Sequence, residues 1–122
     1  MKNFLAVAAA VVAMGLASAS AAVVDFGLDA DTNGERAAPN GLNINGVIMN
    51  FSATPGQAVA YLDASSGGLP AGLGVCKVIA NGDCNPSSDD NVTEGESVTI
   101  SFVNGPFDLS NFTFRDENHN VL

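Results

Sequence analysis

Apolar and polar residues alternate along much of this chain, which is the pattern of β-strands that bury one face. The clearest case is Ser97 to Val103, where Val98, Ile100 and Phe102 point one way and three hydroxyl residues point the other. In a second alternating region the apolar residues fall at even positions first (Leu42 and Ile44) and at odd positions afterwards (47, 49 and 51). Gly46 lies between the two parts. A change of phase at a glycine predicts a bulge or a sharp bend.

Other apolar, β-branched or aromatic runs cover residues 23–28, 57–63, 73–79 and 107–115, and Gly, Asn, Asp, Pro and Ser separate them. No segment after residue 21 places apolar residues at helical spacing. The set of about seven runs therefore predicts an all-β fold, an antiparallel β-sandwich or jelly roll. Within it, residues 77–83 are predicted to form a hairpin, because Asn81-Gly82 suits a type I′ turn.

The first 21 residues have the pattern of a secretory signal peptide. Lys2 supplies a positive charge, residues 4–16 are small and apolar, and Ala19-Ser20-Ala21 offers a cleavage site after Ala21. The alternative is an uncleaved N-terminal anchor. The apolar run is shorter than the roughly 20 residues that span a bilayer, so we expect no membrane span. Residues 22–122 are then predicted to form a single exported domain.

Export decides how the two cysteines are interpreted. In an oxidising compartment, the periplasm or beyond, Cys76 and Cys84 are predicted to form a disulfide rather than a metal or catalytic pair. Only three of the four basic residues remain after position 21, against all 13 acidic residues. So acidic a surface repels nucleic acid and anionic lipid, and it is compatible with plain solubility or with divalent cations.

Residues 29–35 resemble the first half of a calcium loop. Oxygen side chains stand at the first, third and fifth places (Asp29, Asp31, Asn33), a glycine at the sixth, and Glu35 follows. The twelfth place holds Asn40 instead of a bidentate Glu, so this is not an EF-hand. One interpretation is a partial calcium loop between strands; the other is a turn rich in Asp and Asn that binds no metal.

A second oxygen cluster is Asp89-Asp90-Asn91. Two adjacent carboxylates repel each other unless they are solvated, paired or bridged by a cation. Asp89 and Asp90 are therefore candidate calcium ligands, and a solvated loop is the alternative.

Catalytic patterns are weak. The chain has one histidine, His119, no Gly-x-Ser-x-Gly motif, and cysteines expected to be oxidised. Glu94 and Glu96 are expected on one face of a strand, which is a spacing that a glycosidase could use. With no Trp and only Tyr61 as a further stacking side chain, we expect no enzyme. A glycan-binding or glycan-cleaving domain is the alternative function.

Four segments in a fixed order carry a resemblance to a known class: Ala60-Tyr61-Leu62-Asp63, Gly72 to Cys76, Cys84 to Val92, and Phe114-Arg115-Asp116 with His119-Asn120. Over residues 61–120, about half of the chain, they resemble exported bacterial proteins of the PEP-CTERM sorting class, which the exosortase system processes. The resemblance implies a Gram-negative, exopolysaccharide-producing source and an extracytoplasmic β-rich domain of uncharacterised activity.

The resemblance also implies that the Asp89-Asp90 loop and the Arg115-Asp116 segment belong to one framework. We expect them to approach each other, with Arg115 pairing a carboxylate or Asp116 joining an ion site. Proteins of the class end in a Pro-Glu-Pro-like motif, an apolar helix and a basic tail, which this sequence lacks. We therefore interpret the domain as truncated at its C-terminus, the alternative being a soluble relative.

Taken together, the sequence predicts a secreted or cell-surface, matrix-associated structural or binding module, with calcium as its one candidate cofactor. Its expected partners are exopolysaccharide or other surface proteins.

Overall fold

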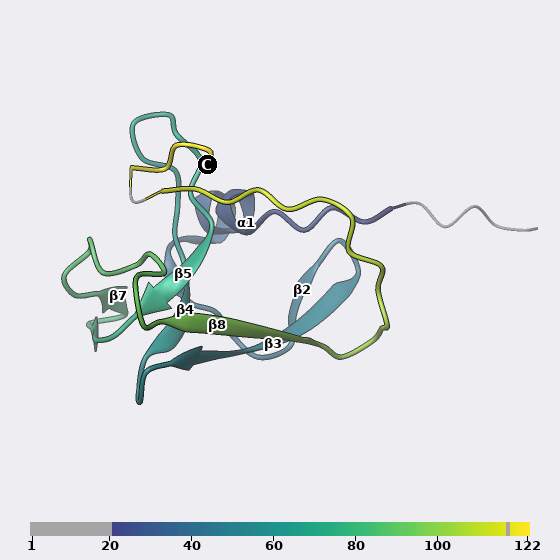
Figure 1. Ribbon diagram of the computed structural model, residues 1–122, viewed down its shortest axis with the longest axis horizontal. Coiled ribbons are helices and arrows are strands. Elements are labelled where there is room, and N and C mark those ends of the chain that lie inside the picture. The colour runs from purple at the N-terminus through teal and green to yellow at the C-terminus, as the bar shows by residue number, and fades with distance from the viewer. Residues whose placement is uncertain (1–20, 117) are drawn as a thin grey trace, which may run out of the picture.

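A computed structural model describes residues 21–116 and 118–122 (Figure 1). The predicted signal peptide, apart from Ala21, lies outside the described residues. Within them the chain forms antiparallel sheets and one short helix, which confirms the all-β prediction at that level. In chain order the elements are α1 (Phe26–Asn33), β1 (Arg36–Ala37), β2 (Leu42–Ile44), β3 (Val47–Thr54), β4 (Val59–Leu62), β5 (Leu73–Cys76), β6 (Ile79–Ala80), β7 (Asp83–Cys84) and β8 (Ser97–Phe102).

The strands pair in three groups. One sheet has the order β1-β4-β5, a second has the order β2-β3-β8, and β6 pairs with β7 alone. The longest ladder joins β3 to β8, with Met49 opposite Phe102 and Thr54 opposite Ser97. In β8 the hydroxyl residues are exposed and the apolar residues are partly buried, as the alternation predicted.

Two of the five Asn-Gly pairs in the chain make the tight turns of hairpins. The φ angles are 51° and 87° at Asn45 and Gly46, between β2 and β3, and 57° and 99° at Asn81 and Gly82, between β6 and β7. Positive φ at both central residues is the signature of a type I′ turn, which Asn and Gly adopt at the least steric cost. The phase change at position 46 is therefore a sharp bend, and the predicted hairpin at 77–83 is confirmed.

The strand predicted at residues 23–28 is wrong, because Phe26–Asn33 forms the helix α1. The Asp25 side chain caps the helix by accepting the Leu28 N–H at 2.9 Å, and Gly34 ends it with its N–H on the Ala30 carbonyl. Its buried residues are Gly27 and Ala30. Because small residues form the buried face, the helix shows no apolar residues at helical spacing.

The strand predicted at residues 107–115 is also wrong. This segment is extended, and apart from a bridge between Arg115 and Val121 it belongs to no ladder. Its apolar residues stand at 107 and 109 and then at 112 and 114, so they cannot share one face of a strand. Figure 1 shows the segment crossing the molecule and ending near the loop that follows β4.

Two small apolar clusters form the core. Ala30, Leu42 and Leu62 pack together, with partly buried side chains that include Phe26 and Phe51 around them. The second cluster holds Tyr61 and both cysteines. β4 supplies Tyr61 to one cluster and Leu62 to the other, so it lies between them and fixes the position of whatever follows it in the chain.

Candidate functional site at the Asp89-Asp90 loop

Cys76 and Cys84 form the predicted disulfide, with their Cα atoms 5.7 Å apart. Both residues are buried against Tyr61, and the Cys84 N–H donates to the Tyr61 hydroxyl at 3.2 Å. Burial raises the pKa of Tyr61, and the negative charges of nearby carboxylates raise it further by a smaller amount. The disulfide thus joins the end of β5 to β7 inside a packed cluster and brings the acidic loop that follows to the edge of β5.

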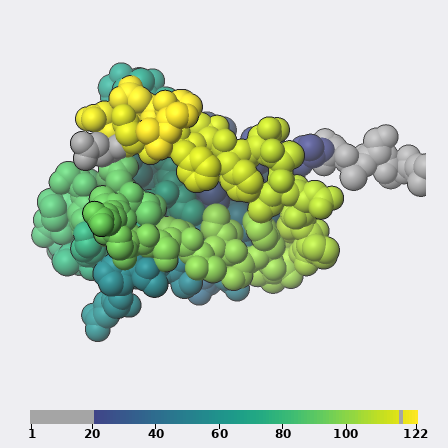
Figure 2. Space-filling model, in the orientation of Figure 1, coloured from purple at the N-terminus to yellow at the C-terminus, as the bar shows by residue number. Residues whose placement is uncertain are grey.

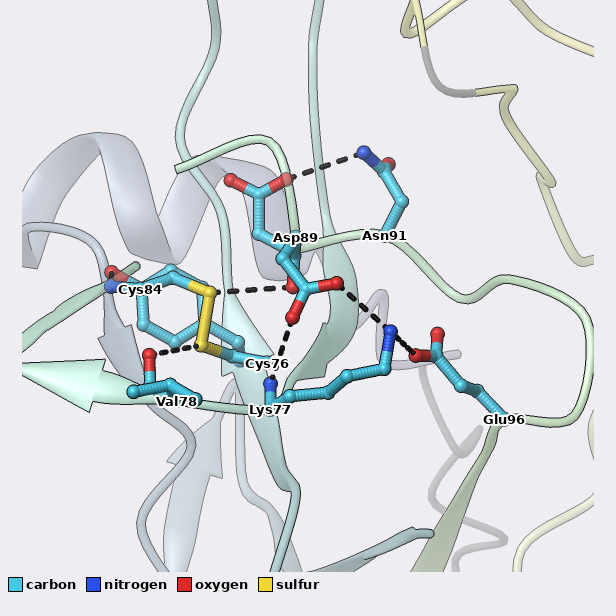
Figure 3. Close-up of a disulfide and its surroundings, with 9 residues drawn as sticks. Cys76, Lys77, Val78, Cys84, Asp89, Asn91 and Glu96 are labelled. Atoms are coloured by element: carbon cyan, nitrogen blue, oxygen red, sulfur yellow. Dashed lines mark hydrogen bonds and ion pairs between the residues drawn. A yellow bond between two sulfur atoms is a disulfide. The ribbon is translucent and has the colours of Figure 1, made fainter. Parts of the chain in front are cut away.

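Lys77 holds one side of this loop (Figure 3). Its Nζ lies 3.0 Å from Asp89 Oδ1 and 2.5 Å from Glu96 Oε1, and its backbone N–H donates to Asp89 Oδ2. The hydrogen bond from Lys77 lowers the pKa of Glu96, and the bonds to Glu96 and Asp89 raise the pKa of Lys77. Asp89 is therefore paired with a cation of the chain itself, and it is not a freely solvated carboxylate.

The expectation that Glu94 and Glu96 share one face of a strand is wrong. Both precede β8, in a turn in which the Glu96 N–H donates to the Thr93 carbonyl and the Thr93 N–H donates to Glu96 Oε2 at 2.7 Å. The two oxygens of Glu96 are thus occupied by Lys77 and Thr93, while Glu94 is exposed. The structure does not bring the pair together as two carboxylates facing one substrate.

Asp90 turns the other way and is buried. Its carbonyl lies over Gly74 of β5, so close that a Cβ at Gly74 would stand 1.5 Å from the oxygen. Asn91 Nδ2 donates to Asp90 Oδ1 at 3.2 Å. Burial, with a smaller contribution from the charge of Glu35, raises the pKa of Asp90.

A second buried carboxylate, Asp63, directly follows β4. His119 Nε2 lies 3.2 Å from Asp63 Oδ2, and the two side chains are 14% and 10% exposed. Burial and the charges of Asp90 and Glu35 raise the pKa of Asp63 to about 6, against a smaller lowering by His119. The pair joins the C-terminal segment to the end of β4, and His119 also lines an open surface pocket with Ser66, Leu69 and Asn118.

The half calcium loop is split by the helix. Asp29 accepts from Arg36 Nη2 at 2.6 Å and from Asn33 Nδ2, while Asp31 accepts from the Ser65 N–H and hydroxyl at 2.6 and 2.7 Å. Residues two apart on a helix face different directions, so Asp29 and Asp31 cannot converge on one ion. Glu35 follows the helix and acts on Asp63 and Asp90 through its charge.

Asp116 and Arg115 make local contacts. Asp116 accepts from the backbone N–H groups of Asn118 and Asn120, both at 2.9 Å, and Arg115 Nη1 donates to the His119 carbonyl. Among the described residues neither Arg115 nor Asp116 bonds to the Asp89-Asp90 loop, so the predicted pairing is wrong, and the C-terminal segment instead contacts Asp63 through His119. Among residues 21–116 and 118–122, no three His, Cys, Asp or Glu side chains are arranged to hold a metal ion.

Sequence reasoning missed Asp63 and His119 as partners. A carboxylate placed directly after the buried run Val59–Leu62 was a signal, because an acid at the end of a buried strand needs a partner. Nothing in the sequence identified that partner, since most of the second half of the chain separates the two positions. The same reasoning placed Glu35 in a calcium loop and did not connect it with the buried pair.

Comparison with known proteins adds no relative. No protein-family model, no curated protein and no solved structure matches this chain. In the part of the chain that the structure describes, no helix has the length and apolar character needed to cross a membrane.

Proposed function

We propose that this chain is an exported structural or binding module that works outside the cytoplasm, at the cell surface or in the surrounding matrix. The observation that carries the proposal is the Cys76–Cys84 disulfide, which is buried in the Tyr61 cluster. A disulfide that is part of the packed interior is typical of domains that fold in an oxidising compartment. The signal-peptide pattern of residues 1–21 and the resemblance to the PEP-CTERM sorting class support the same location.

The packing supports a structural or binding role. Asp89 and Asp90 both have partners within the chain, and the Asp63–His119 pair links the C-terminal segment to the end of β4. We infer that the two three-stranded sheets pack as a small sandwich around the Leu42 and Leu62 cluster. Such a sandwich would hold its exposed strand faces in fixed positions, where a partner could bind them. Exopolysaccharide and other surface proteins are the proposed partners.

The test is the location and oxidation state of the full-length protein in a Gram-negative, exopolysaccharide-producing host. We expect mass spectrometry to find residues 22–122 outside the cytoplasm with both thiols oxidised, and a fraction of the protein to sediment with the matrix. Alkylation of Cys76 and Cys84 in quickly acid-quenched cells reports the oxidation state. A chain that retains residues 1–21 in the cytoplasm with free thiols would overturn the proposal.

A further inference from the structure

One edge of the sheet β2-β3-β8 is open. β8 stands at the end of the strand order, so β3 is its only ladder neighbour. The Val103 N–H donates to the Ile48 carbonyl at 2.8 Å, which sets the phase of the ladder. In an antiparallel sheet the backbone N–H and C=O groups of successive residues point alternately to the two sides of the strand. Ser97, Thr99 and Ser101 therefore bond to β3. The N–H and C=O groups of the three residues between and after them, Val98, Ile100 and Phe102, face the outer edge.

These outward groups have no partner among the described residues. No backbone or side-chain hydrogen bond of residues 21–116 and 118–122 reaches them from outside the sheet. Figure 2 shows β8 (green) at the molecular surface, with the surface hollowed between it and the C-terminal segment (yellow). The outer edge of β8 is therefore unpaired, and at its C-terminal end the Phe107 ring packs on Phe102 with the ring centroids 5.4 Å apart.

Natural sheets protect such edges with charges, prolines, bulges or a covering segment. The sequence of β8 is Ser-Val-Thr-Ile-Ser-Phe, which contains none of the protective residues. Its paired run of six residues with β3 is regular, with no bulge in the register. An uncharged, β-branched edge of this length is a template for strand addition, in which main-chain hydrogen bonds supply the affinity.

Charge indicates the kind of partner. The acidic residues Glu94 and Asp108 flank β8 on either side and are exposed, and the whole chain has a net charge of −9. A second copy of the chain would bring like charges to both ends of the added strand, which opposes self-pairing. A strand with Lys or Arg at its ends and β-branched residues between them complements the edge.

We propose that β8 is the docking edge for an extended, basic-ended segment of another protein, which adds to the sheet as a strand next to β8. The proposal goes beyond the export and surface role, and it holds in whichever compartment the chain resides. A failure of strand addition leaves the export experiment unchanged, so the two proposals fail separately.

The test uses a fluorescent peptide, Lys-Val-Thr-Val-Thr-Val-Lys, and the purified chain without its predicted signal peptide. We expect saturable binding by fluorescence anisotropy, roughly tenfold weaker for the peptide with Glu at both ends, because a few cross-strand charge pairs contribute on that scale. A peptide with alternate backbone nitrogens methylated, so that it cannot donate to β8, should not bind detectably.

Protein variants locate the edge. Val98→Pro removes one outward N–H without touching a bond to β3 and should abolish binding, while Val98→Ala keeps the N–H and should bind. Thr99→Lys should weaken binding, and Ser52→Lys is its matched control, since Ser52 lies opposite Thr99 but on the inner strand β3.

Three outcomes would overturn the proposal: absence of binding, equal binding of the methylated peptide, or a dimer of the chain in sedimentation that excludes the peptide. The methylated peptide is tested against the unaltered protein, so its result is decisive whether or not Val98→Pro folds.

Discussion

The carbonyl oxygen of Asp90 occupies the space in which a side chain at Gly74 would begin, 1.5 Å from the ideal Cβ position. Through this contact the acidic loop packs against β5. The disulfide lies next to it and holds the start of the loop close to the strand. We expect Gly74→Ala to cost at least about 2 kcal/mol of the free energy of unfolding, because the backbone of one segment has to move. Urea unfolding of the purified chain measures the loss.

Gly72 provides the control for this prediction. It lies in the same region, its φ is not positive, and nothing stands within 4 Å of the Cβ that an alanine would add. Gly72→Ala should leave the urea midpoint nearly unchanged or raise it slightly. Equal effects at positions 72 and 74 would show that the Asp90 loop does not rest on β5.

Stability should rise as the pH falls from about 7 to about 5. Asp63 has a folded-state pKa of about 6, above the ordinary value of 3.8, so in this interval the folded state binds more protons than the unfolded state. Lower pH therefore favours the folded state, and the raised pKa of Asp90 acts in the same direction. The carboxylates whose pKa is lowered, Asp31, Glu96 and Asp116, give the opposite slope only below this window.

Thermal unfolding across that pH range tests whether Asp63 causes the pH dependence of stability. Asp63→Asn should flatten the dependence, because the amide has the same shape and no proton to gain. Asp108→Asn, at an exposed carboxylate, should retain the dependence of the wild type. If Asp63→Asn and the wild type show the same slope, Asp63 is not the group responsible.

Glu96→Gln should lower the urea midpoint because it removes the charge that pairs with Lys77. The exposed neighbour Glu94→Gln should leave the midpoint unchanged. The difference between the two variants should shrink in about 1 M salt, since screening weakens the pair. Release of reducing ends from exopolysaccharide by the wild type, lost in either variant, would instead support the glycan-cleaving alternative.

Removing the disulfide should destabilise the chain by about 2.5 kcal/mol, the chain-entropy value for so short a loop. The double variant Cys76→Ala and Cys84→Ala, compared with the oxidised wild type in urea, measures the difference. The reduced wild type should unfold at a midpoint close to that of the double variant. No difference between oxidised and reduced protein would mean that the hairpin β6–β7 holds its position without the cross-link.

Calcium at millimolar concentration should leave the melting temperature unchanged relative to EDTA. Asp29 is paired with Arg36 and Asp31 with Ser65, so binding at this half-loop would require unwinding α1. A rise in melting temperature that disappears in Asp31→Asn would show that the half-loop rearranges around the ion, and calcium would then be restored as a ligand. Mg²⁺ at the same concentration controls for the general effect of divalent cations on an acidic chain.

Sequence alone determined the features that depend on neighbouring residues. The alternation in β8, the Asn81-Gly82 turn, the change of phase at Gly46 and the short cysteine spacing all act within a few positions, where period and turn chemistry decide the structure. The helix α1 was missed because its buried face consists of Gly27 and Ala30, although the capping residues Asp25 and Gly34 already stood in the sequence.

Tertiary structure decided which charged groups meet. Asp63 and His119 are far apart in sequence, and only the path of the C-terminal segment brings their side chains within 3.2 Å of each other. Likewise the partners of Asp29, Asp31 and Asp89 are Arg36, Ser65 and Lys77, which a linear pattern of oxygen side chains could not distinguish from metal ligands. The physical reason is that a carboxylate interacts with whatever charge or donor the fold brings to it, and sequence spacing fixes that partner only within a single regular element.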